Sequence, residues 1–273
     1  MKTSLSTPLA AFALLLTLAA PLRAIVTGQP AAVTLGPDLI NNGGFSSTYS
    51  AGTASAATPG QLNYNGYGVT GWTSTVANGY NFLFNPTLAG SAAYTSSGQN
   101  GNVQLYTSAN GGSATAPASL VSPVGGNFLA LSGAVQPGSL TQVLNGLTAG
   151  QDYQLSFWWA ASQPAGFTGV TTDSLGVTFG NQSFSTATVT NPDHGFTPWT
   201  RVTYTFRPSS TSQTLGFLAV GGPSGTQEPF ALLDGVTLQA MVPEPSSWAL
   251  FAVGAGVLGL AVRRHRGRAV RRV

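Results

Sequence analysis

Few residues in the central region of this chain, residues 25–241, can carry acid–base or metal chemistry. It has no cysteine, which excludes thiolate nucleophiles, disulfides and cysteine–metal sites. A glycosidase needs two positioned carboxyl groups, and a serine hydrolase needs a histidine beside its nucleophile. Between Asp38 and Asp152 there is no acid, base or histidine, and no Gly-x-Ser-x-Gly occurs. We therefore expect no enzyme; a glycan hydrolase remains the alternative, built on acids from the second half of the region: Asp173, Asp193, Glu228 and Asp234.

The charge of the chain is divided unevenly along the sequence. The formal net charge is +3, but from Pro30 to Met241 the only bases are Arg201 and Arg207, against six acids, so this region carries about two minus six, or −4. Nucleic-acid binding requires clustered bases on the domain itself. We therefore expect no nucleic-acid partner.

The sequence predicts that short β-strands position any functional site in the central region. Residues 153 to 159 alternate bulky and polar side chains with a period of two, and no amphipathic helix of normal length occurs. Glycine, proline, asparagine and serine separate further short apolar runs. The pattern predicts an all-β, antiparallel sandwich with strands at these ranges: 128–131, 140–144, 153–159, 175–179, 183–189, 200–206, 214–220 and 230–238. Residues 46–125 are rich in small polar residues and predict long loops with short strands.

Aromatic residues beside amides and hydroxyls are candidates for sugar binding. Sugar rings pack their C–H faces on flat aromatic rings, while their hydroxyls need polar partners; the alternative is ordinary aromatic packing. Trp72, Tyr64 and Tyr67 are candidates in such surroundings, and Trp158 is a candidate because of its direction in its strand, where it either packs against a second layer or faces a ligand. Trp159 lies on the bulky face of its predicted strand and is expected in the core, whereas Trp158 points the other way.

The two ends of the chain have the composition of export signals. At the front, a weakly positive start and an apolar run from Leu9 to Ala20 predict a signal peptide over residues 1–24. At the back, Val242-Pro243-Glu244-Pro245 precedes an uncharged run from Trp248 to Val262. With Ser247 we predict a single transmembrane helix over 247–262, tight for a hydrocarbon core of roughly 30 Å. A basic tail follows the span and marks its cytoplasmic side: Arg263, Arg264, Arg266 and Arg268.

This three-part end resembles the PEP-CTERM sorting signal of Gram-negative bacteria, which spans residues 242–273 here. The resemblance implies processing near Pro243, Glu244 and Pro245 by an exosortase-type protease. It also implies transit through the inner membrane, delivery to the cell surface or extracellular matrix, and association with exopolysaccharide or biofilm.

A second resemblance covers about residues 38–240 of the predicted domain, which spans residues 25–241, and is to galactose-binding-like jelly rolls, which include carbohydrate-binding modules. It is carried by the stretch from Asp38 to Phe45, by the turn and strand from Leu147 to Trp158, and by Leu232 to Leu238. Such domains often hold a structural calcium ion, which implies Asp38 and Asp234 as ligands. The family's acids after the first stretch and beside Asp234 are replaced by Ser46 and Gly235.

The sequence thus predicts an exported, surface-sorted and non-catalytic β-sandwich that is associated with extracellular polysaccharide and binds carbohydrate. A purely structural matrix protein without a specific ligand is the alternative. The two predict different results in a glycan-binding assay.

Overall fold

The computed structural model describes residues 33–50, 59–76, 79–88, 93–223, 225 and 227–243. The predicted signal peptide, the transmembrane helix 247–262 and the basic tail lie outside these residues. No helix within the described ranges is long and apolar enough to cross a membrane.

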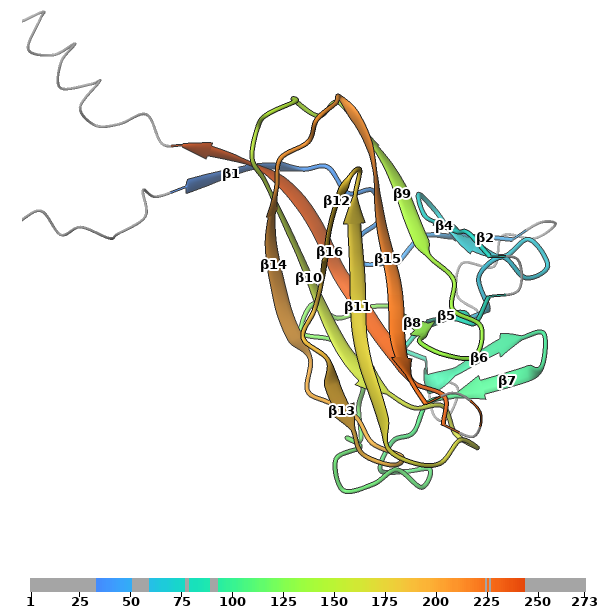
Figure 1. Ribbon diagram of the computed structural model, residues 1–273. Coiled ribbons are helices and arrows are strands. Elements are labelled where there is room, and N and C mark those ends of the chain that lie inside the picture. Colours follow the sequence, from blue (N-terminus) through green and yellow to red (C-terminus); the bar gives the residue numbers. More distant parts are fainter. Residues whose placement is uncertain are drawn as a thin grey trace, which may run out of the picture. The chain divides into compact units, whose positions relative to one another are not determined.

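The described residues form two six-stranded antiparallel sheets, with two small two-stranded sheets beside them, β2-β3 and β6-β7 (Figure 1). Sheet 1 has the order β14-β10-β16-β8-β5, with β1 also paired to β16, and sheet 2 has the order β12-β11-β15-β9-β4, with β13 paired to β11. The bounds are β1 Val33–Asp38, β2 Thr48–Tyr49, β3 Gly68–Val69, β4 Thr73–Ser74, β5 Asn81–Phe84, β6 Thr95–Gly98, β7 Gly101–Gln104, β8 Phe128–Ser132, β9 Leu140–Asn145, β10 Tyr153–Ser162, β11 Thr171–Phe179, β12 Gln182–Ser185, β13 Val189–Asn191, β14 Thr200–Phe206, β15 Ser212–Gly222 and β16 Phe230–Pro243.

The prediction of an all-β antiparallel sandwich is confirmed. From β8 to β11, and again from β14 to β16, each strand lies in the opposite sheet from the one before it, so the chain wraps around the core as in a jelly roll. The predicted strand 183–189 is instead two short strands, β12 and β13, which both pair with β11.

The bulky side chains of the alternating strands fill the space between the two sheets. In β10, Leu155, Phe157 and Trp159 face inward and are nearly or fully buried, as predicted for Trp159. Phe217 of β15 meets Phe157 edge to face, with ring centroids 5.2 Å apart. Burial of such aromatic side chains is the main source of stability for this cysteine-free sandwich.

The loop-rich region supplies a second apolar cluster on the outer face of sheet 1. Phe82, Phe84, Leu105 and Leu120 pack there against Phe128 and other residues of the sheet. The described parts of residues 46–125 are loops and short strands that cover one part of sheet 1 and leave the rest of that face open.

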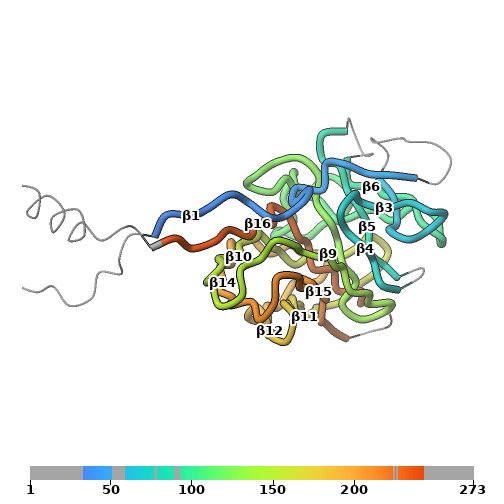
Figure 2. The backbone as a smooth tube through the Cα atoms, turned by 90° about the horizontal axis from the view of Figure 1, so that it is seen from above, coloured from blue at the N-terminus to red at the C-terminus, as the bar shows by residue number. Residues whose placement is uncertain are grey.

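Strands β1 and β16 leave the sandwich side by side, at the same end (Figure 2). Strand β16 continues to Pro243 and so extends past residue 241, the predicted end of the domain.

Candidate functional site

Trp72 is a core residue. Its side chain is 2% exposed and lies between Phe45 and Phe217, with ring centroids 5.6 and 6.1 Å away. Its indole N–H donates to the Asn42 carbonyl at 3.1 Å. The prediction of Trp72 as a sugar platform is therefore corrected, because no ligand can reach the ring.

Tyr64 and Tyr67 lie in one tight turn, where the Tyr67 N–H donates to the Tyr64 carbonyl at 2.9 Å. Tyr67 is partly buried and packs against the core between the sheets. Burial raises the pKa of its phenol to about 12, and a hydrogen bond with Thr48 opposes part of this increase. The turn lies beside β5, which β8 and β16 separate from the strand that carries Trp158. The four predicted aromatic residues therefore do not form one site.

Trp158 lies on the open part of the outer face of sheet 1, partly exposed. It pairs with Arg201 of β14 on one side and with Asp234 of β16 on the other. Residues two and four positions away along the strands continue the same face. We call this surface the polar face; it consists of Gln154, Ser156, Trp158, Arg201, Thr203, Thr205, Thr237 and Gln239.

Hydrogen bonds order the centre of the polar face. The Arg201 guanidinium donates through Nη2 to the Ser156 hydroxyl at 3.2 Å, and this hydroxyl lies 2.8 Å from the Thr237 hydroxyl. Arg201, Thr203 and Thr205 are exposed. A single aromatic ring thus stands beside hydroxyl, amide and guanidinium groups.

A bulge in β16 fixes the position of the Trp158 ring. The register shifts between Ser156 and Trp158, and Gly235 opposite them has φ +59°. A Cβ atom on Gly235 would meet Trp158 Cδ1 at 3.2 Å and Val124 Cγ2 at 2.9 Å. Glycine is therefore required both for the backbone angle and for the close approach of the ring.

Asp38 and Asp234 are too far apart to share a metal ion. Asp38 faces Gln239 of β16, five residues beyond Asp234, which corresponds to about 16 Å along the strand. Calcium ligands lie at about 2.3–2.6 Å from the ion and thus close to one another. The predicted calcium site is corrected on this ground, and no group of three or more histidine or acidic residues within the described ranges is placed to hold a metal.

Both carboxylates instead fix the backbone. Asp38 Oδ1 accepts from the amides of Ile40 at 3.0 Å and Leu238 at 2.9 Å. Asp234 is fully buried and accepts from the Ser122 hydroxyl and from the Gly235 amide, the latter at 2.6 Å. Burial raises the pKa of Asp234 to about 7, against the lowering effect of these two donors.

The acids considered for catalysis are mostly sealed from solvent. Asp173 and Glu228 are each 1% exposed, and burial raises both pKa values to about 7. The Thr171 hydroxyl lowers the pKa of Asp173, and the charge of Glu228 raises it further. Asp193 is half exposed and lies 3.4 Å from His194 Nε2, while Tyr106 stacks on the His194 ring. A polysaccharide has no path to the buried carboxyl groups in this arrangement.

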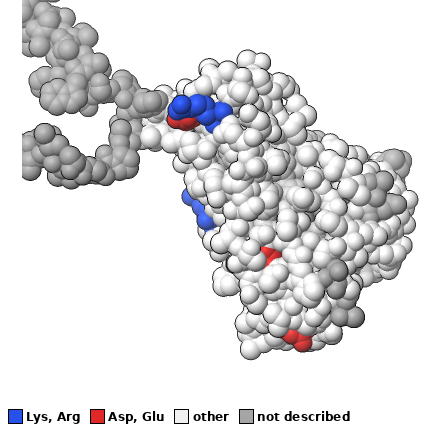
Figure 3. All heavy atoms as spheres, in the orientation of Figure 1, with Lys and Arg blue, Asp and Glu red and all other residues white. Residues whose placement is uncertain are grey.

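Sheet 2 presents a different outer face. A shallow hollow of about 280 Å³ lies there, over Gly176, Thr178, Ser183, Ser185, Gly216 and Leu218. The face toward the viewer in Figure 3 is mostly white, with a few separate blue and red patches. No aromatic side chain belongs to the outward-facing positions that line this hollow, because Phe184 and Phe217 face the core.

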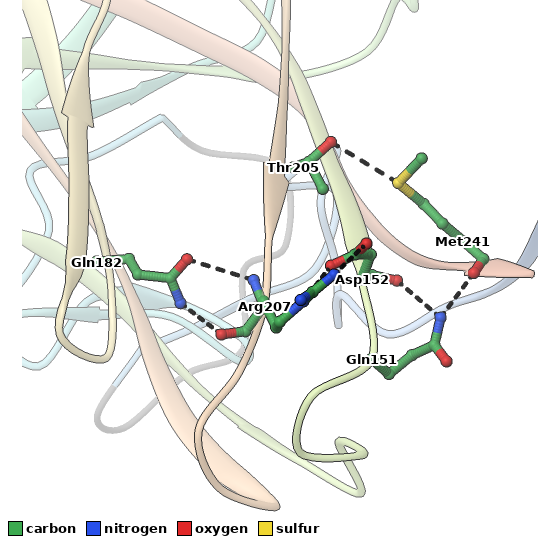
Figure 4. A network of polar contacts seen from close by, with 6 residues as sticks. All are labelled: Gln151, Asp152, Gln182, Thr205, Arg207 and Met241. Carbon is green, nitrogen blue, oxygen red and sulfur yellow. Dashed lines mark hydrogen bonds and ion pairs between the residues drawn. The ribbon is translucent and has the colours of Figure 1, made fainter. Parts of the chain in front are cut away.

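The end where β16 leaves the sandwich is held by a polar network (Figure 4). Gln151 donates through Nε2 to the Met241 carbonyl at 2.6 Å, and the Met241 N–H donates to the Asp152 carbonyl at 2.8 Å. Arg207 binds both oxygens of Asp152, at 2.7 and 2.9 Å, which lowers the pKa of that carboxyl. We call these contacts the exit network. The next residue along the chain is Val242.

Residues 242–266 match the PEP-CTERM protein-sorting motif. This PEP-CTERM motif begins inside β16, directly after the exit network, and confirms the identification made from the VPEP sequence and the apolar span. No curated protein matched the sequence.

Several solved structures resemble the sandwich. The structure of TmCBM61 in complex with β-1,4-galactotriose is 16% identical, covers 74% of this chain and 98% of that chain, and has a TM-score of 0.35. The family 11 carbohydrate-binding module from Clostridium thermocellum, in complex with a β-1,3-1,4-mixed-linked tetrasaccharide, is 11% identical, covers 65% and 93%, and has a TM-score of 0.27. A Clostridium thermocellum xylanase 10B structure is 12% identical, covers 66% and 27%, and has a TM-score of 0.30. Similarities at this level assign no ligand to this chain.

Proposed function

We propose that this chain is an exported, surface-sorted protein whose sandwich binds extracellular polysaccharide and has no catalytic activity. The PEP-CTERM motif at 242–266 supports export and transient anchoring in the inner membrane. The finer steps are part of the proposal: removal of residues 1–24, insertion of 247–262, cleavage by an exosortase-type protease, and release to the cell surface or the biofilm matrix.

One observation carries the binding proposal, namely the position of Trp158 on the polar face. A partly exposed indole offers a flat apolar surface to the C–H face of a sugar ring. The neighbouring groups of Arg201, Thr203 and Gln154 are placed to hydrogen-bond ring hydroxyls. Since the polar face carries a single aromatic ring, we expect weak binding to one or two sugar units of a long chain, strengthened by many copies on a surface.

The test is a pull-down of residues 25–243 on a panel of neutral and acidic polysaccharides. Trp158→Ala should lower retention at least tenfold, because its indole is the only ring among the residues that define the polar face. Trp199, two residues before Arg201, is partly buried and packs against the second apolar cluster. Tyr49→Ala is the matched control, since Tyr49 is an aromatic residue, 51% exposed, on β2. If Trp158→Ala binds as well as the wild type, with both variants folded by circular dichroism, binding through this face is rejected.

A purely structural matrix protein is the second candidate. It is favoured by the charge-poor surface over sheet 2, which offers few groups for specific recognition. It predicts that the wild type binds no polysaccharide on the panel. A hydrolase predicts instead that product is released and that Asp193→Asn or Glu228→Gln abolishes it.

A further inference from the structure

The first two residues of the PEP-CTERM motif are part of a β-ladder. In the antiparallel pair of β1 and β16, Thr34 lies opposite Val242 and Val33 lies opposite Pro243. The motif match starts at Val242. The beginning of the sorting signal is therefore paired with the first strand of the sandwich.

Among the described residues, β1 is the only strand that pairs with this part of β16. The pairing with β8 covers Phe230 to Leu233, and the pairing with β10 ends at Ala240. The last main-chain hydrogen bond on the β10 side is from the Met241 N–H to the Asp152 carbonyl. Because successive N–H groups of a strand point to opposite sides, the Val242 N–H faces β1.

The exit network divides β16 into a fixed part and a part that depends on β1. Gln151 and Asp152 hold Met241 from the β10 side, and the Thr205 hydroxyl reaches the Met241 sulfur at 3.7 Å (Figure 4). None of these contacts involves β1. If β1 separates, Met241 stays in place and Val242 is the first residue to be freed.

The cover that β1 provides is weakly held. Val33 and Leu35 are 42% and 38% exposed, and the register breaks between Leu35 and Asp38. Segments with little buried apolar surface open at a much lower free energy than the whole domain. The opening can therefore occur while the sandwich stays folded.

We propose that residues 33–35 form a removable cover over the start of the sorting motif. A protease that binds its substrate as an added β-strand needs the main-chain groups that β1 occupies. Processing then requires β1 to leave, and the Met241–Val242 boundary sets how far the opening extends. This inference depends on the proposed processing, and it adds where and how the folded chain admits the enzyme.

Because the chain has no cysteine, two engineered cysteines can form a disulfide only with each other within one molecule. Opposed residues in a hydrogen-bonded antiparallel pair have Cα atoms about 5.5 Å apart, within the range that a disulfide spans. Thr34→Cys/Val242→Cys should lock the cover in the oxidising space outside the inner membrane. In the native host, intact mass should show that the fraction processed per unit time falls at least tenfold, and reductant in the medium should restore it.

Two controls separate the lock from its side effects. Val143→Cys/Thr214→Cys joins an opposed pair in β9 and β15, far along the chain from the motif, and should be processed normally. Thr34→Ser/Val242→Ser changes the same positions without a bond and should also be processed normally. Processing of the oxidised Thr34→Cys/Val242→Cys protein at the wild-type rate would overturn the proposal.

Hydrogen exchange tests the same cover without any protease. Thr34→Pro removes a ladder donor from β1 and should abolish protection of the Val242 amide while leaving that of Met241. Joint loss of both protections, or loss of neither, contradicts the assigned boundary. If the wild-type protein is never processed in its host, the sorting proposal fails, and this exchange result still decides whether β1 covers the motif.

Discussion

Trp72 and Trp158 are both sequence-based candidates for sugar binding, and they have opposite positions in the molecule. Trp72 precedes the two-residue strand β4 and is enclosed by Phe45 and Phe217, whereas Trp158 lies in the middle of the long strand β10 and faces outward. The first ring stabilises the contact between the sheets, and the second is available to a partner. The polar sequence around Trp72 is therefore a poor guide to its role, whereas the alternation of the strand around Trp158 correctly predicts its outward direction.

The largest expected difference between the two tryptophans is in stability. Trp72→Ala should lower the free energy of unfolding by about 3–5 kcal/mol, because it leaves a large cavity in the core. Trp158→Ala should cost less, about 1–2 kcal/mol, because the ring is partly exposed on the outer face of sheet 1 and its loss leaves no enclosed cavity in the core. Urea denaturation of both variants, followed by circular dichroism, measures the difference. Equal losses would show that Trp158 is also a core residue.

The buried acids extend the comparison to charge. Asp173 lies on the core side of β11 and Asp234 beside Trp158, and both have pKa values raised to about 7 by burial. In the unfolded chain they titrate near pH 4, so between about pH 4 and 7 the folded state binds more protons. Stability should therefore fall as pH rises through this window.

Asp173→Asn should reduce this pH dependence and stabilise the protein at pH 8 by about 2 kcal/mol. The amide keeps an acceptor for the Thr171 hydroxyl and carries no charge. Unfolding measured at pH 5 and pH 8 checks the prediction, and Asp234→Asn should change the slope in the same direction. A wild-type slope in both variants would mean that these carboxyl groups are ionised in the folded state.

A conservative change separates the volume of Trp72 from its hydrogen bond. Trp72→Phe keeps most of the ring contact and loses the donor to the Asn42 carbonyl, so we expect a loss of about 1–2 kcal/mol. Trp158→Phe should leave stability nearly unchanged. Thermal unfolding of Trp72→Phe and Trp158→Phe measures these losses. If Trp72→Phe loses no stability, the hydrogen bond to Asn42 contributes nothing and the whole loss in Trp72→Ala comes from packing.

The smallest effect is expected at Arg201, beside Trp158. Arg201→Gln should change stability by no more than about 0.5 kcal/mol, because the residue is exposed. Retention on the polysaccharide that binds best should fall two- to fivefold in the same pull-down. If retention is unchanged, Trp158 binds the polysaccharide without a contribution from Arg201 of β14.

The sequence predicts the long strands better than the sites. The alternation of bulky and polar side chains in β10 is enough to place Trp159 inside and Trp158 outside, because neighbouring residues of one strand point to opposite faces of the sheet. Trp72 has no such pattern around it, since its burial depends on Phe217, far away in the chain. The polar start of β11 lies outside the predicted strand 175–179 for a related reason: Thr171 to Ser174 is polar throughout, and the buried Asp173 lies close enough to Glu228, distant in the chain, to feel its charge.

The position of Asp38 and Asp234 shows a further limit of sequence reasoning. Both residues lie near the ends of the resembled pattern, and the distance between them depends on the register of β1 with β16. The same register brings Val242 opposite Thr34, which no local motif in either segment indicates.

The course of β16 also determines how the molecule bears force. This strand runs through the middle of sheet 1 and continues directly into the PEP-CTERM motif, which in the proposed function tethers the protein to the inner membrane during transit. Pulling on the tether loads β16 along its length, against many ladder bonds at right angles to the pull, which must break together and not one after another. A sandwich attached in this way should resist drag from a polymer bound to its side, while β1, which is held only at its margin, is peeled away first.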